Sequence, residues 1–560
     1  MKKAFFLFIL LFSLFLSASP VAAQTFEWAR KTGTGSIATG SAVATEEQGN
    51  CYQAGSFFGV SYFDEFKFRG VARDGYLVKY DRDGKVLWAK DIAGKGDEFA
   101  NALGIDKDGN CLLAGSFAFT VDLGGDTLSS AGQHDIFLAK YDPKGALIWS
   151  KRAGGYYEDH AMALATDRSG NTFVAGFFKD TLRFEGGKIL AGLGISGYNI
   201  FLAKYDSKGN VVWANKLGSS SYPSQNEGLA IATDQNGMVY VTGSYQRDAA
   251  FDSKKFTNRG GYSLFLAKYD QGGKLIWVKS AGSEGSAAVG RGLAVDKKGN
   301  CYVGGTFMGK PAFDSISIMT RNLSYSDVFL AKYNTDGDAL WVRNSNGFGP
   351  KLLYSVRTDA ESNPYIIGSF QDTCIFGNMT MAGKGTDHLF VVKYDAKGEP
   401  VWSRQAGRHG GVHGRDLAFD KSGNIFLTGN FSDTIELGKN TLMAYPHAQD
   451  AYFAKLSTKS LVKEKLLPDP PPADFSFYSA SYESKSQTIT LKYSIPRASF
   501  ILLDIYDLGG SVTESYIESE RQAGTYEIKL DAKNIPKGAE YYIRLQAGTL
   551  KQSKKLELGK

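Results

Sequence analysis

One segment recurs along this chain and restricts its fold more than any other feature. It reads FLAKYDPKGALIWSK at residues 137–151, FLAKYDSKGNVVWAN from Phe201, FLAKYDQGGKLIWVK from Phe265 and FLAKYNTDGDALWVR from Phe329. All seven tryptophans of the chain belong to this repeat, at spacings of 60, 61, 64, 64, 64 and 61 residues. Self-similarity with a fixed period of this kind is typical of repeat architectures.

Residues 102–151 illustrate the strands expected within one copy. The runs ALGID and CLLAGSF flank a short KDGN turn, and DIFLAKY and ALIWSK flank DPKG. An Asp-x-x-Gly connection suits a type I turn in which the glycine takes a positive φ angle. The runs carry β-branched and aromatic residues without a helical period. Each copy therefore predicts a four-stranded antiparallel meander, with strands denoted a, b, c and d.

The two ends of the repeat region indicate how the copies are arranged. The segment FEWARKTG near the start reads as a strand d without a strand c, and the last copy stops at AYFAKLSTKS, residues 451–460, a strand c without a strand d. Pairing of the segment around Trp28 with that around Phe453 would complete the last copy and leave no open edge. We predict an all-β fold: a seven-bladed β-propeller over residues 24–460, with four-stranded blades, closed by the N-terminal strand.

Three residue types recur at equivalent positions of the copies. A glycine in strand b is expected to permit a close backbone approach or a bend. A lysine in strand c and an acidic residue opening the a–b turn are expected to pair blades and cap turns, whereas a ring of functional charge is the alternative. The glycines are Gly55, Gly115, Gly176, Gly243, Gly305, Gly368 and Gly429. The lysines are Lys79, Lys140, Lys204, Lys268, Lys332, Lys393 and Lys455.

The four cysteines do not follow a disulfide pattern. Cys51, Cys111 and Cys301 occupy one repeat position, where other copies have residues such as Thr172 and Val239. A position that accepts these residue types is a small packing site, so free thiols are expected.

The N-terminal residues and the charge restrict the location and the partners. Residues 1–23 contain two lysines, an apolar run and small residues, which is typical of a signal peptide. No later segment has the ~20 apolar residues of a spanning helix, so no transmembrane segment is predicted. Without Lys2 and Lys3 the formal charge is 62 − 58 = +4, spread evenly, and this excludes nucleic acid as the expected partner.

The repeat also resembles a known family. The strings LAVDKKGNCYVGGTF and DVFLAKYNTDGDALW are similar to the bacterial beta-propeller repeat called SBBP, and the resemblance extends over residues 24–460. Ser263 and His388 depart from it, because they replace the aspartate that precedes strand c. The resemblance implies a propeller and export, and no single activity.

A second domain follows the repeats. Residues 461–473 are rich in proline and predict a linker. Residues 474–560 contain alternating runs such as TITLKYSI and FILLDIYD, which suit a small β-sandwich. Their order resembles the type A C-terminal sorting domain of the type IX secretion system. This implies the outer-membrane secretion machinery as a partner and a secreted or cell-surface location; a generic adhesive sandwich is the alternative.

Familiar catalytic and metal-binding motifs are weak in this sequence. GLGISG at 192–197 precedes a strand rather than a helix, so it is no dinucleotide site. His409 and His413 lack carboxylate or cysteine neighbours in sequence, and DKDGN at 106–110 lacks the later ligands of a calcium loop. We predict no catalytic residue, metal or cofactor. A pair of catalytic carboxylates cannot be located without the fold.

Two functions remain open from the sequence. The first is a non-catalytic binding or scaffold protein that contacts an extracellular glycan or protein. The alternative is a secreted propeller enzyme, a polysaccharide lyase, glycoside hydrolase or peptidase-like protein. The b–c and d–a connections are long and divergent, so they predict the binding face, with Tyr156, Tyr157 and Tyr222 as contact residues. Packing over the blades is the alternative role of these aromatic side chains.

Overall fold

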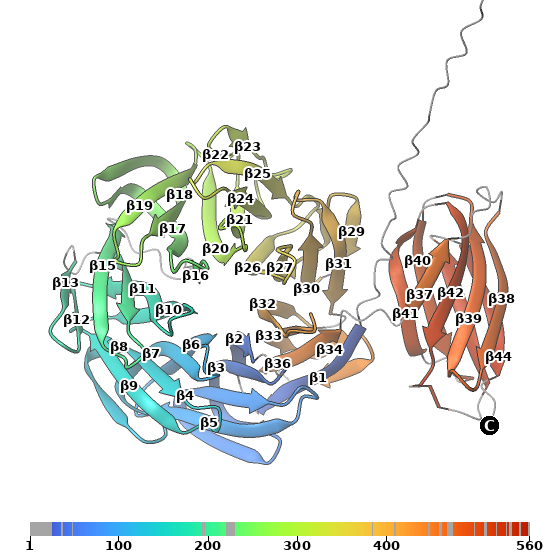
Figure 1. Cartoon of the computed structure of the whole chain (residues 1–560), viewed down its shortest axis with the longest axis horizontal. Helices are drawn as coiled ribbons and strands as arrows, with labels where there is room; N and C mark the ends of the chain where they lie inside the picture. Colours follow the sequence, from blue (N-terminus) through green and yellow to red (C-terminus); the bar gives the residue numbers. More distant parts are fainter. Residues whose placement is uncertain are drawn as a thin grey trace, which may run out of the picture. The chain divides into compact units, whose positions relative to one another are not determined.

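The structure of this protein is a computed structural model in which the described residues form strands and turns without a helix (Figure 1). It describes residues 25–557 except 35–36, 47–48, 193, 195–196, 220–229, 384, 408–409, 446–447, 458–461, 467–473, 498, 509–511, 522, 534, 537–539 and 548–549. The chain divides into two compact units, Gln24–Thr458 and Lys459–Lys560. Since no described helix exists, none is long and apolar enough to span a membrane.

Strands of the first unit follow one another in antiparallel groups of four, each named below by its first strand. The β2 group has β2 (Ala38–Thr45), β3 (Cys51–Phe63), β4 (Phe66–Tyr80) and β5 (Val86–Gly94). The β6 group has β6 (Glu98–Ile105), β7 (Cys111–Asp122), β8 (Thr127–Tyr141) and β9 (Leu147–Gly154). The β10 group has β10 (Asp159–Thr166), β11 (Thr172–Lys179), β14 (Tyr198–Tyr205) and β15 (Val211–Ser219). These strands are the predicted a, b, c and d.

The remaining groups repeat the pattern. The β16 group has β16 (Ala230–Thr233), β17 (Val239–Phe251), β18 (Lys254–Tyr269) and β19 (Leu275–Gly282). The β20 group has β20 (Ala287–Val295), β21 (Cys301–Met308), β24 (Asp327–Tyr333) and β25 (Ala339–Asn344). The β26 group has β26 (Lys351–Thr358), β27 (Pro364–Phe370), β30 (His388–Tyr394) and β31 (Pro400–Ala406). The β32 group has β32 (Val412–Phe419), β33 (Ile425–Ser432), β36 (Gln449–Ser457) and β1 (Thr25–Thr34).

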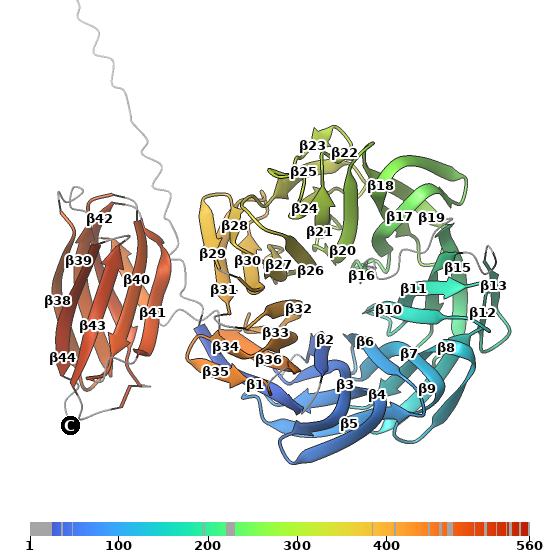
Figure 2. The same ribbon diagram turned by 180° about the vertical axis from the view of Figure 1, so that it is seen from behind.

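The N-terminal strand is the fourth strand of the last group. β1 pairs antiparallel with β36, with Trp28 opposite Lys455 and Ala29 opposite Ala454. The first strand of each group, called the inner strand below, lies around the middle of the unit in Figures 1 and 2. Inner strands of successive groups contact one another, and β2 contacts both β6 and β32.

The long b–c connections are β-hairpins rather than loops. Four of them contain separate short strands: β12 (Thr181–Phe184) and β13 (Ile189–Ala191), β22 (Ala312–Phe313) and β23 (Ile316–Ser317), β28 (Thr373–Phe376) and β29 (Met379–Ala382), and β34 (Thr434–Leu437) and β35 (Asn440–Met443). Several hairpins pair with strand d of the preceding group, as Val121 does with Gly94 and Phe313 with Ala281. Phe63, Phe184 and Phe313 are buried. Much of this divergent sequence therefore serves contact between groups.

In several groups, a tryptophan and a lysine both donate a hydrogen bond to the same backbone carbonyl of the next group. Trp88 Nε1 and Lys79 Nζ both donate to the carbonyl of Pro143, at 3.2 and 2.9 Å. Trp28 and Lys455 likewise both donate, at 3.3 Å each, to the carbonyl of Arg82. The other shared carbonyls belong to Ser207, Gln271, Thr335 and Ala396. The prediction that the repeated lysines pair blades is thus confirmed.

The repeated acidic residue caps the a–b turn, as predicted. Asp106 Oδ1 accepts hydrogen bonds from the backbone N–H groups of Asp108 and Asn110, each at 2.9 Å. Asp106 Oδ2 also lies 2.7 Å from Lys140 Nζ, and both side chains are buried. The four cysteines are buried free thiols, as predicted, and Cys51, Cys111 and Cys301 each begin strand b of their group.

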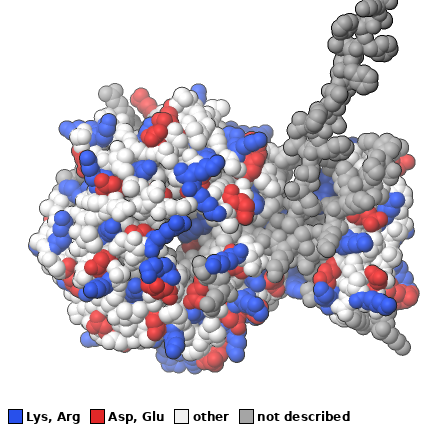
Figure 3. Space-filling model, in the orientation of Figure 1, with Lys and Arg blue, Asp and Glu red and all other residues white. Residues whose placement is uncertain are grey.

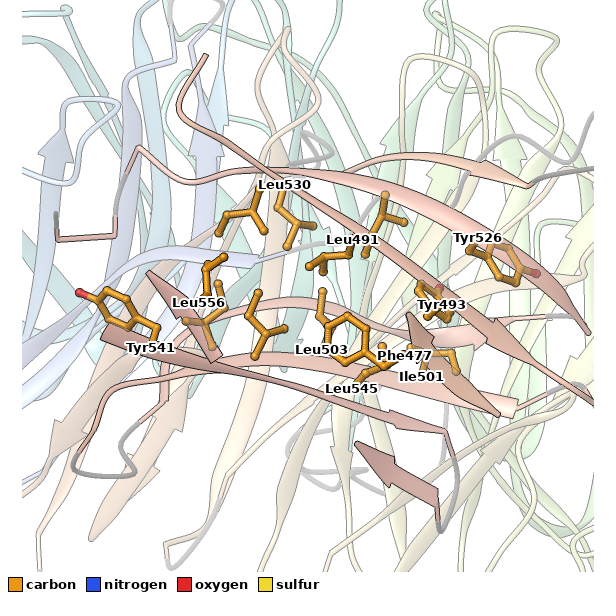
Figure 4. Close-up of a cluster of buried hydrophobic side chains, with 14 of the residues drawn as sticks. Phe477, Leu491, Tyr493, Ile501, Leu503, Tyr526, Leu530, Tyr541, Leu545 and Leu556 are labelled. Carbon is orange, nitrogen blue, oxygen red and sulfur yellow. The ribbon is translucent and has the colours of Figure 1, made fainter. Parts of the chain in front are cut away.

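The C-terminal unit is a two-sheet sandwich. One sheet has the order β37 (Val462–Leu466), β42 (Gly524–Asp531), β39 (Thr488–Ile495) and β38 (Ser476–Glu483). The other has β41 (Val512–Arg521), β40 (Ser499–Tyr506), β43 (Glu540–Ala547) and β44 (Leu550–Glu557). Leucine, isoleucine and aromatic side chains of both sheets fill the space between them (Figure 4).

The structure differs from the prediction at the start of this unit. The expected linker, 461–473, contains β37, in which Val462 pairs with Leu530 of β42. The segment VKEKL precedes the prolines and retains its backbone donors, so it can add to the edge of β42. The proline-rich residues 467–473 lie outside the described part of the chain.

Candidate binding surface at the inner strands

Most inner strands contain one extra residue at the same place. In β6 the register with β7 shifts between Ala100 and Ala102, so Asn101 has no partner on β7. The same β-bulge occurs in five other inner strands, and its position in the β16 group, residue 229, lies outside the described residues. The six extra residues, called bulge residues below, are Ser41, Asn101, Met162, Arg291, Tyr354 and Arg415. A bulge re-aims a side chain and is common next to functional sites.

The repeated glycine of strand b exists because of this bulge. A Cβ atom on Gly115 would lie 1.8 Å from the carbonyl oxygen of Phe99, and one on Gly55 would lie 1.9 Å from that of Thr39. Both carbonyls belong to the residue two positions before a bulge residue. The predicted close backbone approach at this glycine is therefore confirmed.

Bulge side chains are partly exposed, and some contact a bulge residue of the next inner strand; the surface that they form is called the central surface below. Asn101 is partly exposed, whereas Ala100 and Ala102 on either side of it are buried. Its Nδ2 lies 4.0 Å from Met162 Sδ, on the next inner strand. The guanidinium of Arg415 lies 4.3 Å from the ring centroid of Tyr354 in the same way. Figure 3 shows a hollow in the middle of the unit, bordered by several Lys and Arg side chains.

The bulge position differs from the repeated positions in its chemistry. Strand b keeps glycine and strand c keeps lysine in every copy, and where their contacts are described the glycine lies against a backbone carbonyl and the lysine donates to one. The bulge position carries serine, asparagine, methionine, tyrosine and arginine on one repeated backbone. Divergent side chains on a rigid, repeated frame are what recognition of a specific ligand requires.

Two of the predicted contact residues are described. Tyr156 lies between β9 and β10 and is 72% exposed. Its ring meets that of Tyr157 edge-on at 5.2 Å, and Lys179 Nζ lies 5.7 Å from the centroid of Tyr157. Tyr222 lies in 220–229, outside the described residues. The binding role of these tyrosines stays a prediction.

One group of side chains has the composition of a catalytic triad. His413 Nδ1 lies 3.3 Å from Ser369 Oγ, and its Nε2 lies 3.5 Å from Asp387 Oδ2. Burial lowers the pKa of His413, while Asp387 opposes this shift. Ser369 is 1% exposed, so its hydroxyl cannot reach a substrate.

The same contact recurs elsewhere, which assigns it a structural role. His160 Nδ1 lies 2.8 Å from Ser116 Oγ, at the equivalent positions of the β10 and β6 groups, and Ser116 is also buried. The second histidine of the sequence motif, His409, lies outside the described residues. Among the residues that are described, no three His, Cys, Asp or Glu side chains are placed to hold a metal ion.

Glu98, the first residue of β6, and Asp74 of β4 have raised pKa values. Burial, with smaller contributions from Asp74 and Asp97, raises the pKa of Glu98 to about 9. Burial and the charges of Asp91 and Asp97 raise the pKa of Asp74 to about 7. Glu98 is 0% exposed and Asp74 is 2% exposed. Glu98 therefore holds its proton at neutral pH, whereas Asp74 is close to the midpoint of its titration, and both side chains are buried.

Comparisons with known proteins agree with the repeat. A Beta-propeller repeat family, SBBP, matches residues 401–430. An uncharacterized WD repeat-containing protein of Acanthamoeba polyphaga mimivirus is 24% identical over 499 residues, 74% of this chain and 36% of its own length. The regulatory protein FlaEY of Caulobacter vibrioides is 27% identical over 32% of this chain and 18% of its own length. The chain thus spans about a third or less of the curated relatives it matches.

Solved structures show only distant similarity. A protein of unknown function from Bacteroides caccae has a TM-score of 0.32 and 12% identity, covering 63% of this chain and 93% of that one. A gluconolactonase from Xanthomonas campestris has a TM-score of 0.27 and 10% identity, covering 76% and 98%. Together with the repeat match, the strand content defines an all-β protein with beta-propeller repeats.

Proposed function

We propose that this protein is a non-catalytic binding or scaffold protein of the cell exterior, built on a seven-bladed propeller. The pairing of β1 with β36 and the contact between β2 and β32 support a ring in which β1 completes the last blade. Closure of this kind leaves no strand edge available for aggregation.

The observation that carries the binding function is the chemistry of the bulge residues. One backbone feature presents six partly exposed side chains of five different types toward the central surface. A purely structural bulge would need no such variety. We assign ligand contact to this surface and to the neighbouring connections that carry Tyr156 and Tyr157, and an extracellular glycan or protein is the expected ligand.

Delivery to the exterior is the role proposed for the two ends of the chain. Residues 1–23 would direct export, and the C-terminal sandwich would engage the outer-membrane secretion machinery. A chain ending at residue 460 should then remain inside the outer membrane while the full chain reaches the exterior. Equal delivery of both would leave the sandwich an adhesive module.

A secreted enzyme is the second candidate, and the raised pKa values of Glu98 and Asp74 are the observation in its favour. A protonated and an ionised carboxyl group are the pair that a glycosidase or lyase uses. Both side chains are buried, however, and catalytic groups must touch the substrate. This burial favours the binding function.

A glycan-array screen of the full chain tests the proposal. Asn101→Ala with Met162→Ala, and separately Tyr156→Ala with Tyr157→Ala, should weaken any signal while the melting temperature stays nearly unchanged. Lys144→Ala, on an exposed short turn, is the matched control and should leave binding intact. The assignment would be refuted if the control lost binding while both double variants kept it. The site would then lie on the side of the short a–b and c–d turns, called the short-turn side below.

A further inference from the structure

Arginine side chains concentrate on one sector of the central surface. Arg291, Arg357 and Arg415 lie on the consecutive inner strands β20, β26 and β32. These strands pack closely, since a Cβ atom on Gly292 would lie 2.5 Å from the backbone nitrogen of Val356. The inner strands β2, β6 and β10 contain no lysine or arginine.

Arg415 is held in a fixed orientation. Its guanidinium lies 4.3 Å from the centroid of Tyr354, and its Nε donates to Asn430 Oδ1 at 3.2 Å. The hydrogen bond described for this guanidinium comes from Nε, and the side chain is partly exposed. A planar guanidinium oriented by its neighbours can donate two parallel hydrogen bonds to a carboxylate.

Two carboxylates described near Arg415 have other partners. Asp416 is buried and pairs with Arg357 Nη2 at 2.8 Å, and it also accepts from Ser355 Oγ at 2.7 Å. Asp387 is the other acid nearby, and it lies 3.5 Å from His413 Nε2. Asp416 therefore already pairs with Arg357, and Asp387 lies beside His413.

We propose that the surface formed by β20, β26 and β32 binds the carboxylate groups of an acidic oligosaccharide. Arg415 contacts the carboxylate through its guanidinium, which Tyr354 and Asn430 hold in place. Tyr354 adds a flat ring to this surface, and the bulge residues Asn101 and Met162 of β6 and β10 offer an amide and a thioether beyond it. Sugar rings present hydroxyl groups and apolar C–H faces in the same mixture. This inference rests on the proposed function, because it names the ligand class of that surface.

Calorimetric titration of the full chain with a hexamer of galacturonate tests the inference. The methyl-esterified hexamer has the same sugar frame without the charge, and monomeric galacturonate separates an oligosaccharide site from a site for small acids. The hexamer should bind, the ester at least about tenfold more weakly, and raised salt should weaken binding. Failure of the hexamer to bind, equal binding of the ester or the monomer, or preference for an acidic peptide would overturn it.

Substitutions of Arg415 test whether the carboxylate of the oligosaccharide binds in this sector. Arg415→Gln should weaken hexamer binding about 10- to 100-fold, because one charge-assisted contact is lost. Arg415→Lys, which keeps the charge without the planar fork, should fall between that variant and the unsubstituted chain. Arg168→Gln, on an exposed short turn, is the control and should bind normally. Normal binding by a folded Arg415→Gln chain would refute the site, whereas a neutral glycan lost with Asn101→Ala would still support the proposed function.

Discussion

The short-turn side of the first unit and its central surface are built from the same repeat but use it in opposite ways. On the short-turn side, tryptophan and lysine repeat and share one carbonyl from group to group, as Trp213 and Lys204 do with that of Gln271. On the central surface, the backbone bulge repeats while its side chain changes, from Asn101 to Met162 in adjacent groups. Repetition therefore marks the residues that hold the groups together, and divergence marks the position to which we assign recognition.

Deletion of residues 25–31 should break the repeated side most severely. It removes most of β1, including buried Trp28, and exposes the edge of β36. The loss should exceed the about 3–5 kcal/mol that truncation of one buried tryptophan costs. Thermal unfolding and light scattering measure it, and a truncated chain that melts like the full one would refute closure by β1.

Lys140→Met tests a single contact of the repeated side. It leaves Asp106 buried without its cation, which should cost about 3–5 kcal/mol of unfolding free energy. Exposed Lys144→Met should cost less than about 0.5 kcal/mol. Equal stability of the two variants in urea would show that the shared carbonyl contacts contribute little.

Acid titration checks the same contact. Burial acts to raise the pKa of Asp106, but hydrogen bonds from Asn110 and Lys140 lower it overall below its ordinary value. Because the pKa of Asp106 is lower in the folded chain than in the unfolded chain, ionised Asp106 stabilises the fold at a pH above its ordinary pKa. This stabilisation is lost as the pH falls through the pKa of the folded state. The unsubstituted chain should therefore lose more stability below pH ~4 than Lys140→Met does.

Gly115→Ala tests the link between the repeated glycine and the bulge. The added Cβ would meet the carbonyl oxygen of Phe99, so a loss of about 1–3 kcal/mol is expected. Gly411→Ala is the control, because the nearest atom to its added Cβ is 3.6 Å away. Urea unfolding compares the two, and a neutral Gly115→Ala would mean that the bulge does not need the glycine.

Glu98→Gln sharpens the comparison between the two ends of β6. Glu98 holds its proton in the folded state up to about pH 9, whereas in the unfolded chain it ionises near its ordinary value. As the pH rises from the ordinary pKa of glutamate to about 9, the free energy of unfolding should thus decrease by up to about 1.4 kcal/mol per pH unit. This sign is opposite to that of Asp106. Glu98→Gln should flatten the dependence, and an unchanged pH profile would contradict the raised pKa.

The sequence predicted the repeated side well because a residue that makes one contact in many copies leaves a visible pattern. The strands, the pairing of Trp28 with the last group, the Asp106 turn and the free thiols all follow from such patterns. The bulge residues were missed, because one inserted residue in a short apolar strand leaves no periodic signal. The invariant glycine of strand b could have indicated them. The b–c hairpins were also missed, since their sequences differ in every copy.

The most direct test of the central claim is the unfolding of chains in which bulge residues are replaced by one and the same residue. Asn101, Met162, Arg291, Tyr354 and Arg415 would each be replaced by serine, the residue already present as Ser41. If this position serves recognition, the free energy of unfolding in urea should fall by no more than about 0.5 kcal/mol per substitution. A loss as large as that of Lys140→Met, from these five substitutions taken singly, would contradict the account by showing that the divergent position also holds the ring together.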